Sequence, residues 1–137
     1  MSRILMRLAS AAAIAVACRS ATAPEPCSGP IALSVVSGTQ PSFAWSPGCG
    51  ITMLTVEALR DDPALAGRVV WTFTMPQQTP AGPRIVYGRP PSGAVHSTQS
   101  EPLVVGQRYR VRVMYVPDGR DAALASGEVS FTWFPPD

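Results

Sequence analysis

The sequence contains no lysine and a single histidine, and both scarcities narrow the range of functions. All eleven basic residues are arginines, and the first two, Arg3 and Arg7, lie at the very start. The rest of the chain therefore contains nine arginines and nine acidic residues. This balance gives no electrostatic footprint for nucleic acid and no basic patch for anionic lipid headgroups. We therefore expect no nucleic-acid partner.

The sequence also lacks the residue clusters that support catalysis. It has no nucleophile-elbow sequence, metal-ligand cluster or glycine-rich phosphate loop. His96 has no second histidine with which to hold a metal, so we interpret it as a solvated loop residue. Asp61 and Asp62 precede a proline, which is typical of a turn, whereas calcium needs about six to eight oxygens from several positions. The sequence predicts no enzyme activity, cofactor or metal.

No apolar run is long enough to span a bilayer, which takes about twenty helical residues. The apolar run at residues 8–16 covers about nine residues, includes one serine and follows Arg3 and Arg7. A positive segment before a short apolar segment is typical of a cleaved export signal. We therefore expect residues 1–17 to be removed from the mature protein.

Residues 15–18, Ala-Val-Ala-Cys, resemble the lipobox of bacterial lipoproteins. The resemblance implies that Cys18 is acylated and tethers the protein to a membrane. Arg19 and Ser20 lack the aspartate associated with inner-membrane retention, which favours the outer membrane where a cell has two. Two alternatives are ordinary cleavage after Ala23, before a proline, and ordinary cleavage that leaves Cys18 as a free thiol.

The three cysteines are an odd number for an exported protein. If Cys18 carries lipid, Cys27 and Cys49 remain to form a disulfide, with two free thiols as the alternative. The disulfide would close a loop of about 22 residues and stabilise the fold by roughly 3 kcal/mol. Residues 18–30 are rich in proline and form a tether, and the distance from Cys18 to Cys27 is at most about 30 Å.

Short β-rich runs separated by turn residues predict one all-β sandwich over residues 31–137. The expected strands are 31–36, 42–46, 51–59, 68–75, 84–87, 108–116 and a last strand containing Val129. A helical turn is expected at 64–66, and loops at 88–102 and 117–126. In the fourth run Val69, Trp71 and Phe73 alternate, which predicts that they share a buried face.

The clearest strand, 108–116, has apolar residues at every second position and arginines between them. This alternation predicts a core face and a solvated face that carries Arg108, Arg110 and Arg112. Opposing strands should supply acids to the arginines, and Glu57 and Glu128 are the nearest candidates.

Three segments together resemble the fibronectin type III family: Leu103-Val-Val-Gly106-Gln-Arg-Tyr109, Phe43-Ala-Trp45-Ser-Pro47 and Ser126-Gly127-Glu128-Val129. The resemblance implies an immunoglobulin-like sandwich in which the tyrosine packs in the core and returns its hydroxyl to nearby backbone. It also implies that Cys27 and Cys49 lie at the same end of the domain. The expected structural core includes Trp45, Trp71, Leu103, Gly106 and Tyr109. Residues 75–101 depart from the family pattern.

The function expected from these features is that of a membrane-anchored envelope protein with a non-catalytic interaction or structural module. Its partners would be the membrane, through the lipid, and another envelope protein or a glycan. A second hypothesis is a glycan- or polymer-binding module that uses a ligand loop containing Tyr87 and His96. Three tryptophans could form a stacking platform, but their phase on the strands favours burial.

Overall fold

The computed structural model describes residues 23–62 and 64–137. The predicted signal peptide, the predicted acylation site Cys18 and the first part of the tether lie outside the described residues.

Nine strands make up the regular structure of this part of the chain. They are β1 (Gly29–Pro30), β2 (Ala32–Val36), β3 (Ser42–Ser46), β4 (Met53–Ala58), β5 (Arg68–Thr74), β6 (Ile85–Val86), β7 (His96–Ser97), β8 (Arg108–Tyr115) and β9 (Ala125–Thr132). No membrane-spanning helix occurs in residues 23–62 or 64–137. The helical turn predicted at 64–66 is wrong, because a non-helical turn forms there instead. In this turn the Asp62 side chain accepts a hydrogen bond from Ala64 N (2.9 Å), and the Asp62 carbonyl accepts one from Leu65 N (3.1 Å).

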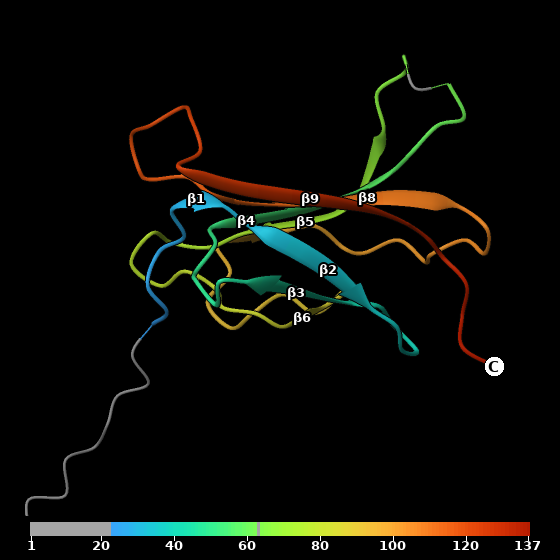
Figure 1. Cartoon of the computed structure of the whole chain (residues 1–137), viewed down its shortest axis with the longest axis horizontal. Coiled ribbons are helices and arrows are strands. Elements are labelled where there is room, and N and C mark those ends of the chain that lie inside the picture. The colour runs from blue at the N-terminus through green and yellow to red at the C-terminus, as the bar shows by residue number, and fades with distance from the viewer. Residues whose placement is uncertain (1–22, 63) are drawn as a thin grey trace, which may run out of the picture.

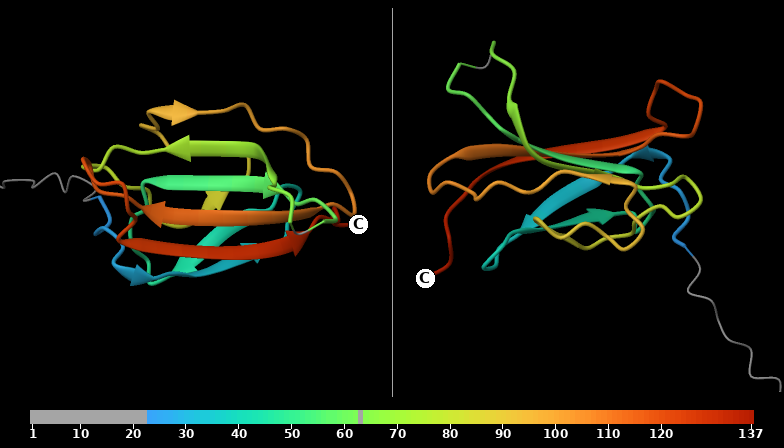
Figure 2. Two further views of the ribbon diagram at one scale, coloured as in Figure 1. Left: turned by 90° about the horizontal axis from the view of Figure 1, so that it is seen from above. Right: turned by 180° about the vertical axis from the view of Figure 1, so that it is seen from behind.

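The strands form two facing sheets, as predicted for a β-sandwich (Figure 1). The larger sheet has the order β1-β9-β8-β4-β5-β7 and the smaller one the order β2-β3-β6. The pairs are antiparallel except for β1 and β9, which run parallel. Figure 2 shows the smaller sheet lying across one face of the larger sheet, so the other face of the larger sheet is directed to solvent.

The core lies between the sheets and follows the predicted alternation. On β8, every second residue from Tyr109 to Tyr115 is buried. The largest fully buried side chains include Trp71, Tyr109 and Phe43. Burial of such aromatic side chains, each worth about 2–3 kcal/mol, is what holds the layers together.

The outer face of the larger sheet carries the arginines, and their predicted acidic partners are confirmed. Arg110 lies opposite Glu57 on β4 and binds its carboxylate at 2.6 Å. Arg112 lies opposite Glu128 on β9 and binds its carboxylate at 3.2 Å. Arg108 lies opposite Thr132 and is exposed.

A register shift between Val56 and Glu57 changes the face on which Val69 lies. Val56 pairs with Trp71, but Glu57 pairs with Val69, so Val70 is the extra residue of a β-bulge. Val70 is therefore buried and Val69 is 48% exposed. The prediction that Val69 shares a buried face with Trp71 is wrong for this reason.

The predicted loop 88–102 contains an additional edge strand, β7, which pairs with β5. Backbone hydrogen bonds extend this pairing to either side, from Val95 N to Thr74 O (2.9 Å) and from Thr98 N to Thr72 O (3.0 Å). The backbone groups of a buried strand require partners, and this polar segment supplies them to β5.

Candidate functional site

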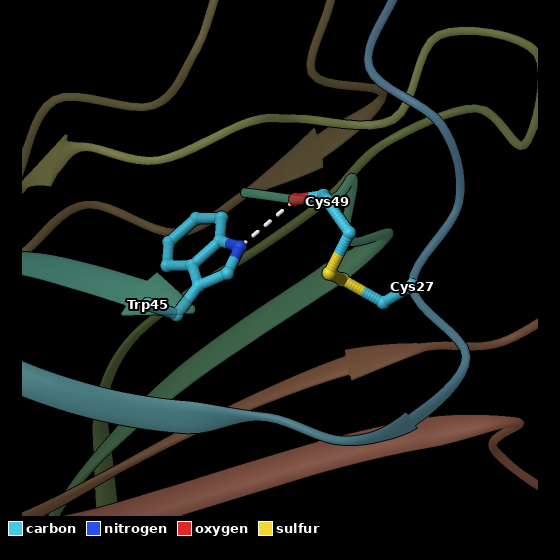
Figure 3. Close-up of a disulfide and its surroundings, with 3 residues drawn as sticks. All are labelled: Cys27, Trp45 and Cys49. Atoms are coloured by element: carbon cyan, nitrogen blue, oxygen red, sulfur yellow. Dashed lines mark hydrogen bonds between the residues drawn. A yellow bond between two sulfur atoms is a disulfide. The ribbon is translucent and has the colours of Figure 1, made fainter. Parts of the chain in front are cut away.

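The disulfide predicted between Cys27 and Cys49 is present and fixes the start of the domain (Figure 3). The two Cα atoms are 4.8 Å apart, and Cys27 is 1% exposed. Backbone hydrogen bonds flank the bridge, from Cys27 N to Gly50 O (2.9 Å) and from Gly50 N to Glu25 O (2.6 Å). The indole of Trp45 donates to Cys49 O at 2.8 Å. We call this pole of the sandwich, with Cys27 and Cys49, the disulfide end.

At the opposite pole Tyr109 forms the predicted hydrogen bond to backbone. Its hydroxyl accepts from Val104 N at 2.8 Å, and its ring stacks on Phe131 with centroids 5.6 Å apart. Gly106 has φ +80°, a conformation that favours glycine, and its N–H donates to Trp133 O at 2.8 Å.

The residues predicted to form the structural core lie mostly where expected. Trp45, Trp71 and Tyr109 are buried, and Leu103 is half-buried against the core. Gly106 is exposed and acts through its backbone conformation. Trp133 is also buried, so none of the three tryptophans offers a stacking platform.

Tyr87, which the second hypothesis places in a ligand loop, is buried. Its ring meets the Trp71 ring edge-on at 5.3 Å, and its hydroxyl donates to Glu101 O at 2.7 Å. Burial raises the pKa of the Tyr87 hydroxyl to about 12. The other proposed loop residue, His96, is exposed on edge strand β7, so the two side chains do not form one ligand surface.

Gln107 ties together three segments at the pole opposite the disulfide. Its side-chain amide donates to Leu59 O at 2.7 Å, at the base of the hairpin between β4 and β5. Its N–H donates to Val104 O at 3.1 Å, and its carbonyl accepts from Trp133 N at 3.0 Å. We call this pole, with residues 59–62, 64–67, 102–107 and 133–134, the hairpin end.

The β4–β5 hairpin rises from the solvent-facing side of the larger sheet, away from the smaller sheet (Figures 1 and 2). Between the hairpin and the sheet lies a hollow of about 610 Å³, which we call the hairpin hollow. Residues 59–61 and 64–67 line one side, and Arg108, Arg110 and Ser130 line the other.

Two guanidinium groups, those of Arg110 and Arg108, set the electrostatics of the hairpin hollow, and only that of Arg110 is paired with a carboxylate. The hydrogen bond to Glu57 raises the pKa of Arg110, so that this cation is partly neutralised by its partner. The Nε atom of Arg110 is buried and has no hydrogen-bond partner in the described part of the chain. Arg108 takes part in no salt bridge among the described residues and keeps its charge available to a ligand.

Five of the seven large hydrophobic residues that are exposed in the described part of the chain lie at the hairpin end or next to it. Leu65 and Val69 lie on the hairpin or next to it, and Val104, Val105 and Phe134 lie on the segments joined by Gln107. In the described part of the chain, the other two large hydrophobic residues that are exposed are Val95 and Leu124. Grouped exposed apolar residues mark interaction sites more often than scattered ones do.

The sequence did not predict this surface because the direction of the hairpin depends on a distant contact, the hydrogen bond from Gln107 to Leu59 O, 48 residues away along the chain. A Cβ at Gly67 would lie 3.0 Å from the Glu57 carboxylate and 3.1 Å from Ala58 O, so the hairpin's return strand packs closely on β4. The one hint of this surface in the sequence is the apolar residue Leu65, in the segment predicted to form a helical turn.

No group of three or more His, Cys, Asp and Glu side chains suited to a metal ion occurs within the ranges that the structure covers. Comparison of the chain with protein-family models, curated proteins and solved structures finds no match.

Proposed function

We propose that this protein is a bacterial envelope lipoprotein, anchored through acylated Cys18, whose β-sandwich is a non-catalytic interaction module. The observation that carries the proposal is the difference between the two ends of the domain. The chain enters at the disulfide end, on the side of the smaller sheet (Figure 1). The hairpin hollow lies at the other end and on the opposite face, so a membrane attached to the tether would lie on the far side of the domain from it.

The disulfide supports the part of this proposal that concerns export. Disulfides persist in oxidising compartments outside the cytoplasm and are rare within it. The Cys27 Sγ and Cys49 Sγ atoms are bonded to each other, and this leaves Cys18 as the third cysteine of the chain, available for lipid.

We also infer that the sandwich is of the immunoglobulin-like, fibronectin type III kind. The sheet order β2-β3-β6 facing β9-β8-β4-β5 agrees with strands A, B and E facing G, F, C and C′ of that fold. The hydrogen bond at Tyr109 is a second point of agreement. Domains of this architecture serve many functions, so the assignment supports a binding role by analogy alone.

Replacement of Cys18 by alanine should release the protein from the membrane fraction or leave its signal uncleaved. The reason is that no spanning helix occurs in residues 23–62 and 64–137, so a lipid-anchored form of the protein would depend on its acyl chains for membrane binding. Fractionation of the exporting cells, with immunodetection, measures the distribution. Ser20→Ala is the matched control and should remain in the membrane. Retention in the membrane of a Cys18→Ala protein that has been cleaved to its mature size would refute the anchor.

Substitution of exposed apolar residues at the hairpin end should weaken contact with a partner protein. We expect crosslinking in intact cells to give an adduct heavier than a dimer of this chain. The double variant Leu65→Ser with Val105→Ser should reduce the amount of this adduct at least about tenfold, which corresponds to a loss of about 1.4 kcal/mol in binding.

The matched control carries the same kind of change at the other two exposed apolar positions, Val95→Ser and Leu124→Ser. These residues are 57% and 48% exposed, similar to Leu65 at 51% and Val105 at 62%. The control should retain the adduct. An equal loss in both double variants would contradict a partner surface at the hairpin end.

A further inference from the structure

Strand β9 lies at one margin of the larger sheet, and most of its outer edge has no strand partner. It pairs with β8 from Ala125 to Thr132, but on its other side β1 covers only Ala125 and Ser126. On this side no strand pairs with residues 127–132, but β2 lies close to β9, and a Cβ at Gly127 would meet the Ile31 carbonyl. The edge that remains open within the described structure is therefore residues 128–132 (Figure 2, left). An open edge of this length is a template for pairing with another strand.

The backbone groups at this edge are directed outward, as a pairing strand requires. Trp133 N donates to Gln107 O on the β8 side, whereas Ser126 O accepts from Ile31 N (3.1 Å) on the outer side. Backbone groups alternate between the two sides of a strand. The residues that direct N–H and C=O to the open edge are therefore Glu128, Ser130 and Thr132.

We propose that this edge pairs antiparallel with the same edge of a second copy of the chain, with Ser130 opposite Ser130. In this register Glu128 of each copy lies opposite Thr132 of the other. All of these residues direct their backbone groups to the edge, so the three residue pairs form about six hydrogen bonds, two in each pair. A shift of the register by a single residue would lose this match.

The charges on the solvent-facing side favour the same register. Arg108 lies beside Thr132 in the sheet and has no salt-bridge partner in the described part of its own chain. Across the interface Thr132 faces Glu128 of the second copy, so Arg108 extends over a small side chain toward that carboxylate. Arg112 approaches the same carboxylate from its own copy at 3.2 Å. Opposite charges alternate along the row, and no like charges face each other.

The apolar residues on the inner side are complementary as well. Val129 and Phe131 are partly buried hydrophobic residues packed against the core. In the proposed register Val129 of each copy lies opposite Phe131 of the other. Pairs of an aromatic and a β-branched residue are favourable across strands, and the contact covers apolar surface that one copy leaves accessible.

The pairing is compatible with attachment of both copies to one membrane. Antiparallel edges are related by a two-fold axis perpendicular to the sheets, and this rotation keeps the start of both domains on the side of the smaller sheet (Figure 1). The five-residue ladder is short, and a small interface gives weak association in solution. Confinement to a membrane would raise the effective concentration, but the pairing itself does not depend on the anchor.

Cysteine crosslinking of the full-length chain, exported by a bacterial host, tests the pairing. Ser130→Cys should give a dimer with a short bismaleimide, at least about tenfold more than the matched control Ser97→Cys. Both serines are exposed, but Ser97 lies on β7 at the other margin of the sheet. The unsubstituted chain shows any contribution from Cys18. No dimer with Ser130→Cys, or equal dimer with both variants, would overturn the proposal.

Two further variants separate pairing from folding. Ser130→Pro removes an N–H at the open edge while leaving the β8 ladder intact, because proline is tolerated on edge strands. It should sediment as a monomer at concentrations where the unsubstituted chain forms dimers, with a similar unfolding midpoint. Arg108→Glu, added to Ser130→Cys, should reduce crosslinking at least about tenfold by placing a carboxylate near Glu128. Unchanged sedimentation or unchanged crosslinking in these variants would contradict the register.

Discussion

Replacement of both Cys27 and Cys49 by alanine is expected to lower the free energy of unfolding by about 3 kcal/mol. The bridge joins residues 22 positions apart, and a crosslink of this span removes conformational entropy from the unfolded chain. The bridge also holds the turn whose carbonyl accepts from the Trp45 indole. Urea unfolding followed by tryptophan fluorescence gives the difference.

Reduction provides the matched control for this prediction. Dithiothreitol should shift the unfolding midpoint of the unsubstituted protein to that of the alanine variant and should leave the variant unchanged. A midpoint that does not respond to complete reduction would show that the disulfide contributes nothing to the fold.

The features predicted correctly from the sequence are those set by local alternation or by residue chemistry. The alternation on β8 was sufficient to separate buried Tyr109 from Arg110 and to predict acidic partners on neighbouring strands. The Cys27–Cys49 pair followed from cysteine chemistry.

The errors arose where contacts between distant segments override the local pattern. A bulge in the pairing of β4 with β5 exposes Val69. The polar strand β7 has no apolar alternation, and only the unpaired edge of β5 explains its position. The hairpin hollow depends on the direction of a hairpin that is held by Gln107.

Trp71→Ala should lower the free energy of unfolding by about 3–5 kcal/mol, the largest effect that we expect from one side chain. Trp71 is fully buried, and its ring lies 5.3 Å from those of both Phe73 and Tyr87. Urea unfolding at neutral pH measures the loss, and Trp71→Phe should lose less because it leaves a smaller cavity. Val69→Ala, at an exposed position on the same strand, is the matched control and should change stability by less than about 0.5 kcal/mol.

Trp71→Ala should also change how strongly alkaline pH lowers the free energy of unfolding. The pKa of Tyr87 is about 12 in the folded protein and 10.0 when unperturbed. Because the folded-state pKa is raised, the contribution of Tyr87 to stability is complete below pH 10. It is lost as the pH rises through about 12, by about 3 kcal/mol. Burial is the main cause of the shift, so water entering the space left by Trp71 should lower the pKa toward 10 and make this alkaline loss smaller. An alkaline loss of unchanged size in Trp71→Ala, or in Trp71→Phe if the alanine variant does not fold, would mean that Trp71 does not shield the hydroxyl.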